Sequence, residues 1–405
     1  MINLIKMAYR DLGRNRRRTF FSSLALGLGL ALLLLMAGVI QWEIQDSTDK
    51  SVQLQSGHLQ VRAKTYNEDK TSLDWSDLIE NPDAVAAQIA SLAPVQVATP
   101  RLYASGIVVS GDASLGVRII GIEPDSPANA PFRNGLVSGQ FLTADDTSGI
   151  LIGKTLADKM GLKDGDTTTL MINTSNGSVD QQAFTIRGIY STGTPTYDET
   201  TVFMPLAKAQ AFSQAGNHAS IIFILLKDRQ QTNAVVNALQ SSQYQVLTFE
   251  EMNPLLVLVD TYANSFMIVL YMIVLAVTVT VIVNTLVMSV FERTREIGIL
   301  AAVGMKSSWI MTLFFAESCF LAVGGILLGL IIGIPLVNWV GSVGIPVGNL
   351  GVTGLMFGDR IYTILTIQDS VSLSLLALFV SLLASLYPAI LAARMEPVEA
   401  LHTGQ

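Results

Sequence analysis

Four long stretches of the chain contain almost no charged residues, and each is long enough to cross a membrane. They cover residues 19–42, 261–291, 309–340 and 370–393, and the only charge inside them is Glu317. About 20 apolar residues are needed for a helix to span the hydrocarbon core of a bilayer. The pattern therefore predicts an integral membrane protein with four transmembrane helices.

A cleaved signal peptide is the competing interpretation of the first stretch. The apolar region of a signal peptide has about 7–15 residues and precedes small residues at the cleavage site. The stretch at 19–42 is longer, and the sequence IQWE at its end is a poor cleavage context. We therefore expect an uncleaved membrane anchor.

Residues 43–260 show a different pattern, in which short runs rich in β-branched residues alternate with turn signals. Such runs are typical of strands, and longer stretches with helical spacing intervene. The predicted strands are 58–62, 107–110, 117–122, 167–172, 183–189 and 221–226, and the predicted helices are 81–91, 155–160, 205–214 and 231–240. The pattern predicts a large α+β domain inserted between the first and second transmembrane helices.

The composition supports a membrane protein and excludes two other classes. Hydrophobic residues make up 50% of the chain and charged residues 14%, against about 25% charged residues in soluble domains. The net charge is −7, and the acidic residues are concentrated between residues 42 and 262. A nucleic-acid-binding protein would concentrate positive charge instead, so we expect no nucleic acid as a partner.

Basic residues predict the orientation in the membrane, because Lys and Arg are enriched on the cytoplasmic side. Those before the first span are Lys6, Arg10, Arg14, Arg16, Arg17 and Arg18. We expect a protein of the plasma (inner) membrane with both termini in the cytoplasm. Residues 1–18 are then a basic amphipathic helix, 292–308 a cytoplasmic loop and 394–405 a cytoplasmic tail. The domain at 43–260 and the loop at 341–369 lie outside.

Glu317 lies about a quarter of the way into the third span, where a carboxylate is costly and usually faces the protein interior. Two interpretations remain open. The carboxylate ties the third span to the cytoplasmic loop or to a partner, or it lies near enough to the interface for water to reach it.

Glycines are frequent in the same span, at positions 324, 325, 329 and 333. Small residues at this spacing allow helices to approach closely in a membrane. Glycine is also tolerated in a helix that faces lipid, and the sequence does not separate the two interpretations.

No pattern in the chain predicts catalysis. The segment GILIGKT at 149–155 resembles a phosphate-binding loop but has three residues between its glycines, where that loop needs four. His58, His218 and His402 are scattered, without partners at the spacing of metal ligands. We therefore expect a protein that is not an enzyme, with no catalytic, cofactor-binding or metal-binding residues.

The loop between the second and third spans has the most informative sequence, FERTREIGILAAVG at 291–304. Its charges come first, and Ile297, Leu300, Ala301 and Gly304 follow at helical spacing. We expect a short amphipathic helix, with Gly304 at its end. The helix either docks into a partner or is a solvated connection.

This loop resembles the cytoplasmic coupling loop of the FtsX-like, or macrolide-exporter-like, ABC transporter permeases, the type VII mechanotransmission class. Other segments are similar to the same family. They are the basic N-terminal helix with Ile2, Ile5, Tyr9 and Leu12 on one face, the outer stretches 151–170 and 187–207, and the C-terminal sequence 387–401. The segment FGDRIY at 357–362 is most similar to the lipoprotein-releasing permeases.

The resemblance implies a permease subunit that pairs with a second permease subunit, as a homodimer or a heterodimer, and with a separate cytoplasmic ABC ATPase. ATP-driven motion would reach the outer domain, for lipoprotein release or for export of a hydrophobic substrate. The alternative is a transmembrane regulator of an extracytoplasmic cell-wall hydrolase. The residues expected to couple to the ATPase are Glu292, Arg293, Arg295, Glu296, Gly298 and Gly304.

Overall fold

The structure is a computed structural model that describes residues 7, 10, 13–14, 16–67, 73–239, 243–346 and 360–395. Most of the predicted N-terminal amphipathic helix lies outside these ranges, as do His402, the end of the C-terminal sequence and the first half of the segment 357–362. The chain forms two compact units. They are a helical unit (Met1–Ile44, Asp260–Ile345, Ile361–Gln405) and an α/β domain (Gln45–Val259, Pro346–Arg360).

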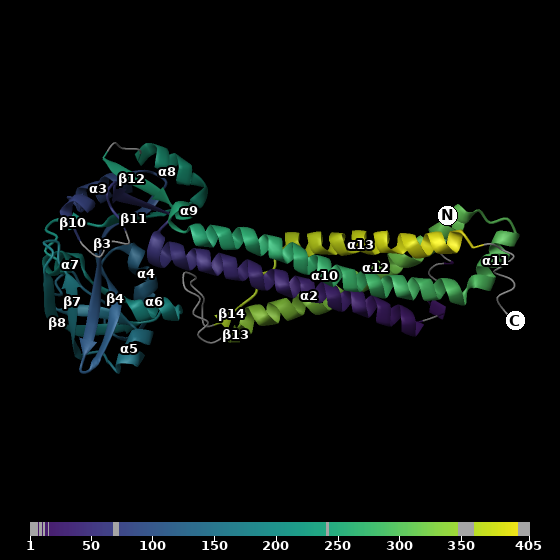
Figure 1. Ribbon diagram of the computed structural model, residues 1–405, viewed down its shortest axis with the longest axis horizontal. Helices are drawn as coiled ribbons and strands as arrows, with labels where there is room; N and C mark the ends of the chain where they lie inside the picture. Colours follow the sequence, from purple (N-terminus) through teal and green to yellow (C-terminus); the bar gives the residue numbers. More distant parts are fainter. Residues whose placement is uncertain are drawn as a thin grey trace. The chain divides into compact units, whose positions relative to one another are not determined.

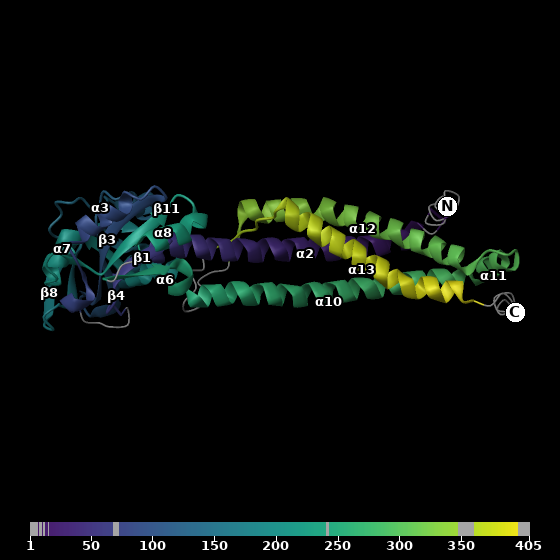
Figure 2. The ribbon, with the colours of Figure 1, turned by 90° about the horizontal axis from the view of Figure 1, so that it is seen from above.

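Four long helices run alongside one another in the helical unit (Figures 1 and 2). They are α2 (Arg16–Lys50), α10 (Pro254–Glu292), α12 (Ser307–Val343) and α13 (Ile367–Ala393), and the short helix α11 (Thr294–Ala302) joins α10 to α12. All four are long and apolar enough to cross a membrane, so the predicted fold class is confirmed. The helices extend beyond the uncharged stretches because polar residues continue them, as at Asp46 and Lys50, which form an ion pair of 2.8 Å in the last turn of α2.

The glycines of α12 form its contact with α2. A Cβ atom built on Gly325 would lie 2.1 Å from Leu26, and one on Gly329 would lie 2.9 Å from the carbonyl oxygen of Gly27. A Cβ atom on Gly333 would meet Leu34 at 2.9 Å. The two backbones therefore approach as closely as small residues allow in a membrane, which decides between the two interpretations of these glycines.

We predict that Gly329→Ala destabilises the helical unit by about 1–3 kcal/mol, because the added methyl group must push the two helices apart. The midpoint of thermal unfolding in a mild detergent measures the effect. Gly324→Ala is the matched control, since a Cβ atom there has no neighbour closer than 3.4 Å, the hydroxyl of Ser23. Equal midpoints for the two variants would contradict the close contact.

The α/β domain is built on one large mixed sheet. The strand order is β12-β1-β11-β3-β4-β9-β6-β8-β5, and β7 pairs with both β3 and β8. The strands are β1 (Leu59–Ala63), β3 (Val95–Ser110), β4 (Ala113–Ile122), β5 (Leu136–Gly139), β6 (Gly149–Gly153), β7 (Thr167–Asn173), β8 (Val179–Tyr190), β9 (Thr201–Pro205), β11 (Ile221–Leu226) and β12 (Tyr244–Thr248). The β4–β9 and β6–β8 pairs are parallel, and the other pairs are antiparallel.

Short helices and two small sheets complete the domain and the loop after α12. The helices are α3 (Pro82–Ala90), α4 (Ala130–Asn134), α5 (Lys154–Met160), α6 (Pro195–Thr200), α7 (Leu206–Phe212), α8 (Thr232–Leu239) and α9 (Phe249–Met252). The small sheets pair β2 (Ile79–Glu80) with β10 (His218–Ala219) and β13 (Ile345–Pro346) with β14 (Arg360–Ile361). The apolar sides of the large sheet are buried, with Leu170, Val202, Phe203 and Phe223 fully covered.

The first span continues directly into the α/β domain. Helix α2 is followed by the π-helix η1 (Ser51–Ser56), which the domain holds through backbone oxygens. The carbonyl oxygen of Leu54 accepts hydrogen bonds from the Tyr197 hydroxyl at 3.0 Å and from Arg101 Nη1 at 3.2 Å. Ser51 donates to the side-chain oxygen of Asn253, next to the start of α10, at 3.0 Å. The ends of two long helices are therefore tied together inside the domain.

Candidate functional site

The segment between α10 and α12 is an ordered helical connection. Helix α10 ends at Glu292, Arg293 leaves the helical conformation, and α11 begins at Thr294. The Thr294 hydroxyl donates a hydrogen bond to the carbonyl oxygen of Phe291 at 2.9 Å. The Ile297 N–H donates to the carbonyl oxygen of Arg293, also at 2.9 Å. These bonds hold α11 at a fixed angle to the end of α10.

The other end of α11 is closed by a Schellman motif, the turn in which a left-handed residue stops a helix. Gly304 has φ +95°, which L residues with a side chain rarely adopt. Its N–H donates to the carbonyl oxygen of Ala301, and the Met305 N–H donates to that of Leu300, both at 3.0 Å. Glycine is therefore needed at position 304 to turn the chain from α11 into α12.

One side of α11 packs against the ends of the long helices. Ile297 is 4% exposed and Gly298 is also buried. The buried cluster around Ile297 draws on α10, α12 and α13 and contains Val290, Ile310, Phe314, Ala389 and Ala392. This packing anchors α11 to three long helices.

A buried ion pair reinforces this anchor. Arg293 Nη1 lies 3.5 Å from a carboxylate oxygen of Glu317, and their side chains are only 5% and 4% exposed. Arg293 belongs to the turn before α11, and Glu317 belongs to the third turn of α12. The contact between the third span and the connecting loop, one of the two interpretations of Glu317, is the one present in the structure.

Two further ion pairs join the connection to the beginning of the chain. Arg14 Nη2 lies 2.8 Å from a carboxylate oxygen of Glu296, and Arg18 Nη1 lies 2.5 Å from one of Glu292. Exposed pairs of this kind contribute little stability, about 0–1 kcal/mol each. The first pair links Arg14, which precedes α2, to α11, and the second links the first turn of α2 to the end of α10.

The opposite side of α11 is exposed and apolar. Ile299 is 49% exposed and Val303 is 84% exposed. Arg295, Ile299 and Val303 follow at intervals of four residues, which places them on one face of a helix. Exposed apolar side chains beside a cation are a common composition for a surface that another protein covers. We call these three residues the exposed face of α11.

The structure divides the six predicted coupling residues into two groups. Arg293 and Gly298 are buried within the helical unit, whereas Glu292, Arg295, Glu296 and Gly304 are exposed. Sequence reasoning missed Ile299 and Val303, although their spacing of four residues from Arg295 was a usable signal. It also missed Arg14 and Arg18 as partners, because nothing in the local sequence links positions more than 270 residues apart.

The features that resembled catalytic motifs have structural roles in the α/β domain. Gly153 ends β6, where a Cβ atom would lie 2.0 Å from the carbonyl oxygen of Asp198, so glycine is required by close packing.

The two described histidines also have structural roles. His58 Nδ1 accepts a hydrogen bond from the Leu226 N–H at 3.1 Å, and burial lowers the pKa of its imidazole. His218 stacks on Trp75. Among the described residues, no group of three metal-ligating side chains is present.

Two known protein families match the chain in succession. The MacB-like periplasmic core domain matches residues 19–242, more than half of the chain, and the FtsX-like permease C-terminal domain matches residues 268–397. The chain belongs to the FtsX-like ABC transporter permeases. In this permease the MacB-like match includes most of the first long helix and continues through most of the α/β domain, and α11 lies within the FtsX-like part.

Similar proteins cover most of this permease. It is 24% identical to the lipoprotein-releasing system transmembrane protein LolC of Neisseria meningitidis, over 95% of this permease and 93% of LolC. It is 23% identical to LolE of Haemophilus influenzae, over 94% of this permease and 93% of LolE. It is 27% identical to the macrolide export ATP-binding/permease protein MacB of Rhodospirillum rubrum, over 85% of this permease and 54% of MacB. The match to LolC and LolE therefore extends over nearly their whole length.

Proposed function

We propose that this permease transmits the ATP-driven motion of a separate cytoplasmic ABC ATPase to its α/β domain, for lipoprotein release or for export of a hydrophobic substrate. The observation that carries the proposal is the combination found at α11. One face is anchored to three long helices, and Ile299 and Val303 on the other face are 49% and 84% exposed. A helix with these two faces can bind a partner through its exposed side and transmit the partner's movement to the long helices through its buried side.

The proposed orientation places α11 and both chain termini in the cytoplasm of a cell with this permease in its plasma (inner) membrane. Basic residues support it, since they are concentrated before and in the first turn of the first long helix and in the connection around Arg293 and Arg295. The α/β domain, with its excess of acidic residues, then lies outside. The boundaries of the predicted spans, at 19–42, 261–291, 309–340 and 370–393, belong to this proposal.

The path to the α/β domain runs through the two helices that enter it. Helix α2 continues into η1, and the Leu54 carbonyl oxygen there is held by Tyr197 and Arg101. Ser51 and Asn253 link η1 to the start of α10. Movement of either helix along its axis would therefore act on the domain through hydrogen bonds at buried sites. Allosteric coupling requires a structural element with two conformations, and binding at one site must favour one of them. Helices α2 and α10 are the proposed elements.

The substrate class follows from the relatives. LolC and LolE are named for lipoprotein release and MacB for macrolide export. Because the permease matches LolC over 93% of that protein, we propose lipoprotein release first. Nothing in the relatives or in the α/β domain favours the regulator of a cell-wall hydrolase. A second permease subunit is part of the proposal, since four spans per chain are few for a transport path.

Co-purification tests the proposal. The tagged chain is extracted from its native membrane in mild detergent, and mass spectrometry identifies its companions. We expect an ABC ATPase in stoichiometric amount, a second permease subunit and, for the lipoprotein-releasing function, a bound lipoprotein. A folded, monodisperse preparation without any ATPase would contradict the proposal.

We predict that Glu296→Lys uncouples ATP hydrolysis from motion of the α/β domain while leaving expression unchanged. The native Glu296 carboxylate lies 2.8 Å from Arg14, and the substitution replaces this attraction by repulsion between two positive charges. The N-terminal segment should then move away from α11, while the stability changes by about 1 kcal/mol or less. The readout is the ATP-dependent change in limited proteolysis of the α/β domain in the complex. Restoring the pair with Arg14→Glu in the same chain should recover coupling, and unchanged coupling in the single variant would remove Glu296 from the site.

A further inference from the structure

The π-helix η1 ends in carbonyl oxygens that side chains of the α/β domain hold. The Gly57 N–H closes the helix with a hydrogen bond to the carbonyl oxygen of Val52 at 2.9 Å, a separation of five residues. The last carbonyl oxygens of a helix have no partners inside the helix. In η1 they accept hydrogen bonds from the side chains of Gln60, Arg101, Tyr103 and Tyr197. Side chains from β1, β3 and α6 therefore take the place of a further helical turn.

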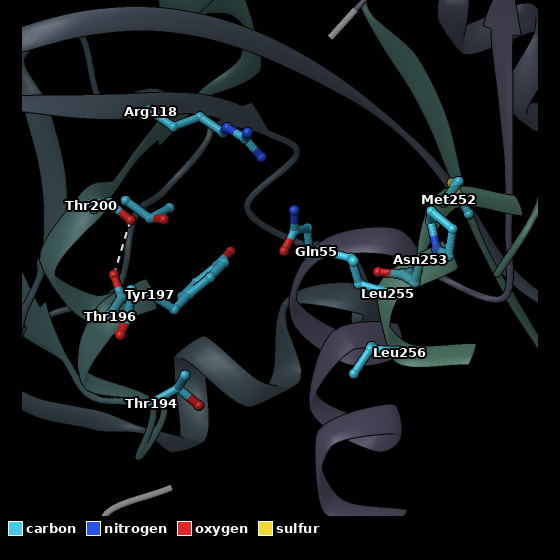
Figure 3. A pocket seen from close by; sticks show the side chains of 12 residues that line it. Gln55, Arg118, Thr194, Thr196, Tyr197, Thr200, Met252, Asn253, Leu255 and Leu256 are labelled. Atoms are coloured by element: carbon cyan, nitrogen blue, oxygen red, sulfur yellow. Dashed lines mark hydrogen bonds between the residues drawn. The ribbon is translucent and has the colours of Figure 1, made fainter. Parts of the chain in front are cut away.

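A pocket of about 470 Å³ lies beside η1 within the domain. Gln55 and Tyr197 line it, together with the first residues of α10. Figure 3 shows the Tyr197 hydroxyl pointing towards the segment that carries Gln55. Protein interiors are otherwise close-packed, so this space lets the backbone of η1 move without a clash. Turns of the π type are rare and occur frequently at functional sites, and η1 is therefore a segment that can change its hydrogen-bond register.

Arg101 is the unusual member of the four side chains that hold η1. It is 0% exposed, and its guanidinium lies 3.6 Å from the centre of the Phe223 ring. Its Nη1 donates to the carbonyl oxygen of Leu54 at 3.2 Å, whereas its Nε and Nη2 have no hydrogen-bond partner in the described part of the chain. A buried charge is costly unless it is paired and hydrogen-bonded, and an aromatic ring offsets only part of the cost. The present arrangement therefore leaves two strong donors unused.

Arg62 shows a satisfied buried arginine in the same sheet. It is 8% exposed, and its Nε and Nη2 donate to the side-chain oxygen of Gln60 at 2.9 and 2.7 Å. Its guanidinium also lies 5.3 Å from the centre of the Tyr66 ring. The unused donors are therefore a property of position 101 and not of every buried arginine in this sheet.

We propose that Arg101 is a positioning residue that follows η1 between two arrangements, an inference that rests on the proposed transmission of motion to the α/β domain. In the present arrangement its guanidinium holds the carbonyl oxygen of Leu54. When η1 changes from hydrogen bonds five residues apart to bonds four residues apart, different carbonyl oxygens face the guanidinium. Nε or Nη2 then gains an acceptor, which stabilises the second arrangement. Arg101 thereby makes different contacts in the two states, as coupling between distant sites requires.

The unused donors predict an unusual result for the full chain without its ATPase. Arg101→Met should leave the thermal midpoint of the α/β domain unchanged or raise it, because methionine can pack on Phe223 without a buried charge. Tyr197 still donates to the carbonyl oxygen of Leu54 at 3.0 Å in this variant. Arg62→Met is the matched control and should lower the midpoint by several degrees, because it removes hydrogen bonds that are satisfied. Limited proteolysis on heating in mild detergent measures the midpoints, and an equal fall for the two variants would contradict the unused donors.

Hydrogen exchange of η1 tests the positioning role in the complex with the ATPase. The peptide of residues 51–57 is followed with and without a non-hydrolysable ATP analogue. In the unsubstituted protein its exchange rate should differ at least about tenfold between the two conditions, because a hydrogen bond to a charged donor is gained or lost. Arg101→Met should lose this difference while it retains the ATPase. Arg101→Lys keeps a charged donor near the carbonyl oxygen of Leu54 and should restore at least about half of the difference.

Limited proteolysis of the α/β domain in the same complex separates this inference from the proposed function. If proteolysis responds to the analogue but exchange of residues 51–57 does not, the role of Arg101 is overturned and the transmission stands. The same holds if Arg101→Met exchanges like the unsubstituted protein, or if Arg101→Lys exchanges like Arg101→Met. If neither proteolysis nor exchange responds in the unsubstituted complex, the proposed transmission fails, and the role of Arg101 fails with it.

Discussion

Replacing Glu317 by alanine is expected to destabilise the helical unit by about 3–5 kcal/mol. The substitution leaves the guanidinium of Arg293 buried without its carboxylate, and removal of one partner of a buried ion pair has this magnitude. Arg293 is 5% exposed and lies in the turn before α11, so the loss should loosen the anchor of α11 as well. The measurement is the midpoint of thermal unfolding of the detergent-solubilised chain.

Matched variants separate this effect from the loss of a surface charge. Glu296→Ala removes a carboxylate whose ion pair with Arg14 is exposed, and it should change stability by about 1 kcal/mol or less. The double variant Arg293→Met with Glu317→Leu should recover much of the lost stability, because apolar groups of similar size can replace a buried pair. If Glu317→Ala changed the free energy of unfolding by less than about 1 kcal/mol, the ion pair would not be a source of stability for the helical unit.

Replacing Val303 by aspartate is expected to weaken binding of the ATPase by about 2 kcal/mol or more, roughly thirtyfold, without destabilising the chain by itself. Val303 is 84% exposed, so the folded chain gains little from its side chain. In the proposed complex it would lie in the centre of the contact, where truncation or charge has the largest effects. The amount of ATPase that co-purifies with the variant measures the loss.

The control for this variant is Val179→Asp, a similarly exposed valine at the start of β8 in the α/β domain. It should retain the ATPase in full. Retention of the ATPase by Val303→Asp at the level of Val179→Asp would exclude the exposed face of α11 as the docking surface.

The long elements were predictable from sequence, and their ends were not. Hydrophobicity located the four long helices, but it could not show that α2 continues to Lys50 in polar sequence. Only residues 107–110 of β3 were predicted, although the strand runs from Val95 to Ser110. In the structure Pro100 lies opposite Ile222 within an antiparallel pair, and the strand continues through Pro100 and Gly106. The packing of β3 against its neighbouring strands determines the length of this strand, and the local conformational preferences of proline and glycine do not.

The candidate site was only partly predictable for a related reason. The charge cluster comprised Glu292, Arg293, Arg295 and Glu296. It could not show that Arg293 is buried against Glu317. Helix α11 has apolar residues on both sides, so helical spacing alone does not decide whether Ile297 or Ile299 faces a partner. The neighbours of Ile297 on α12 and α13 are distant in sequence, and they decide that it lies inside and Ile299 outside.

The most direct test of the account is a photo-cross-link from position 303 in intact cells. Benzoylphenylalanine is incorporated in place of Val303, with Val179 as the matched position in the α/β domain. The account predicts that irradiation joins position 303 to an ABC ATPase and that position 179 gives no such product. Cross-links from position 303 only to lipid or to extracytoplasmic proteins would contradict both the proposed orientation and the role of α11.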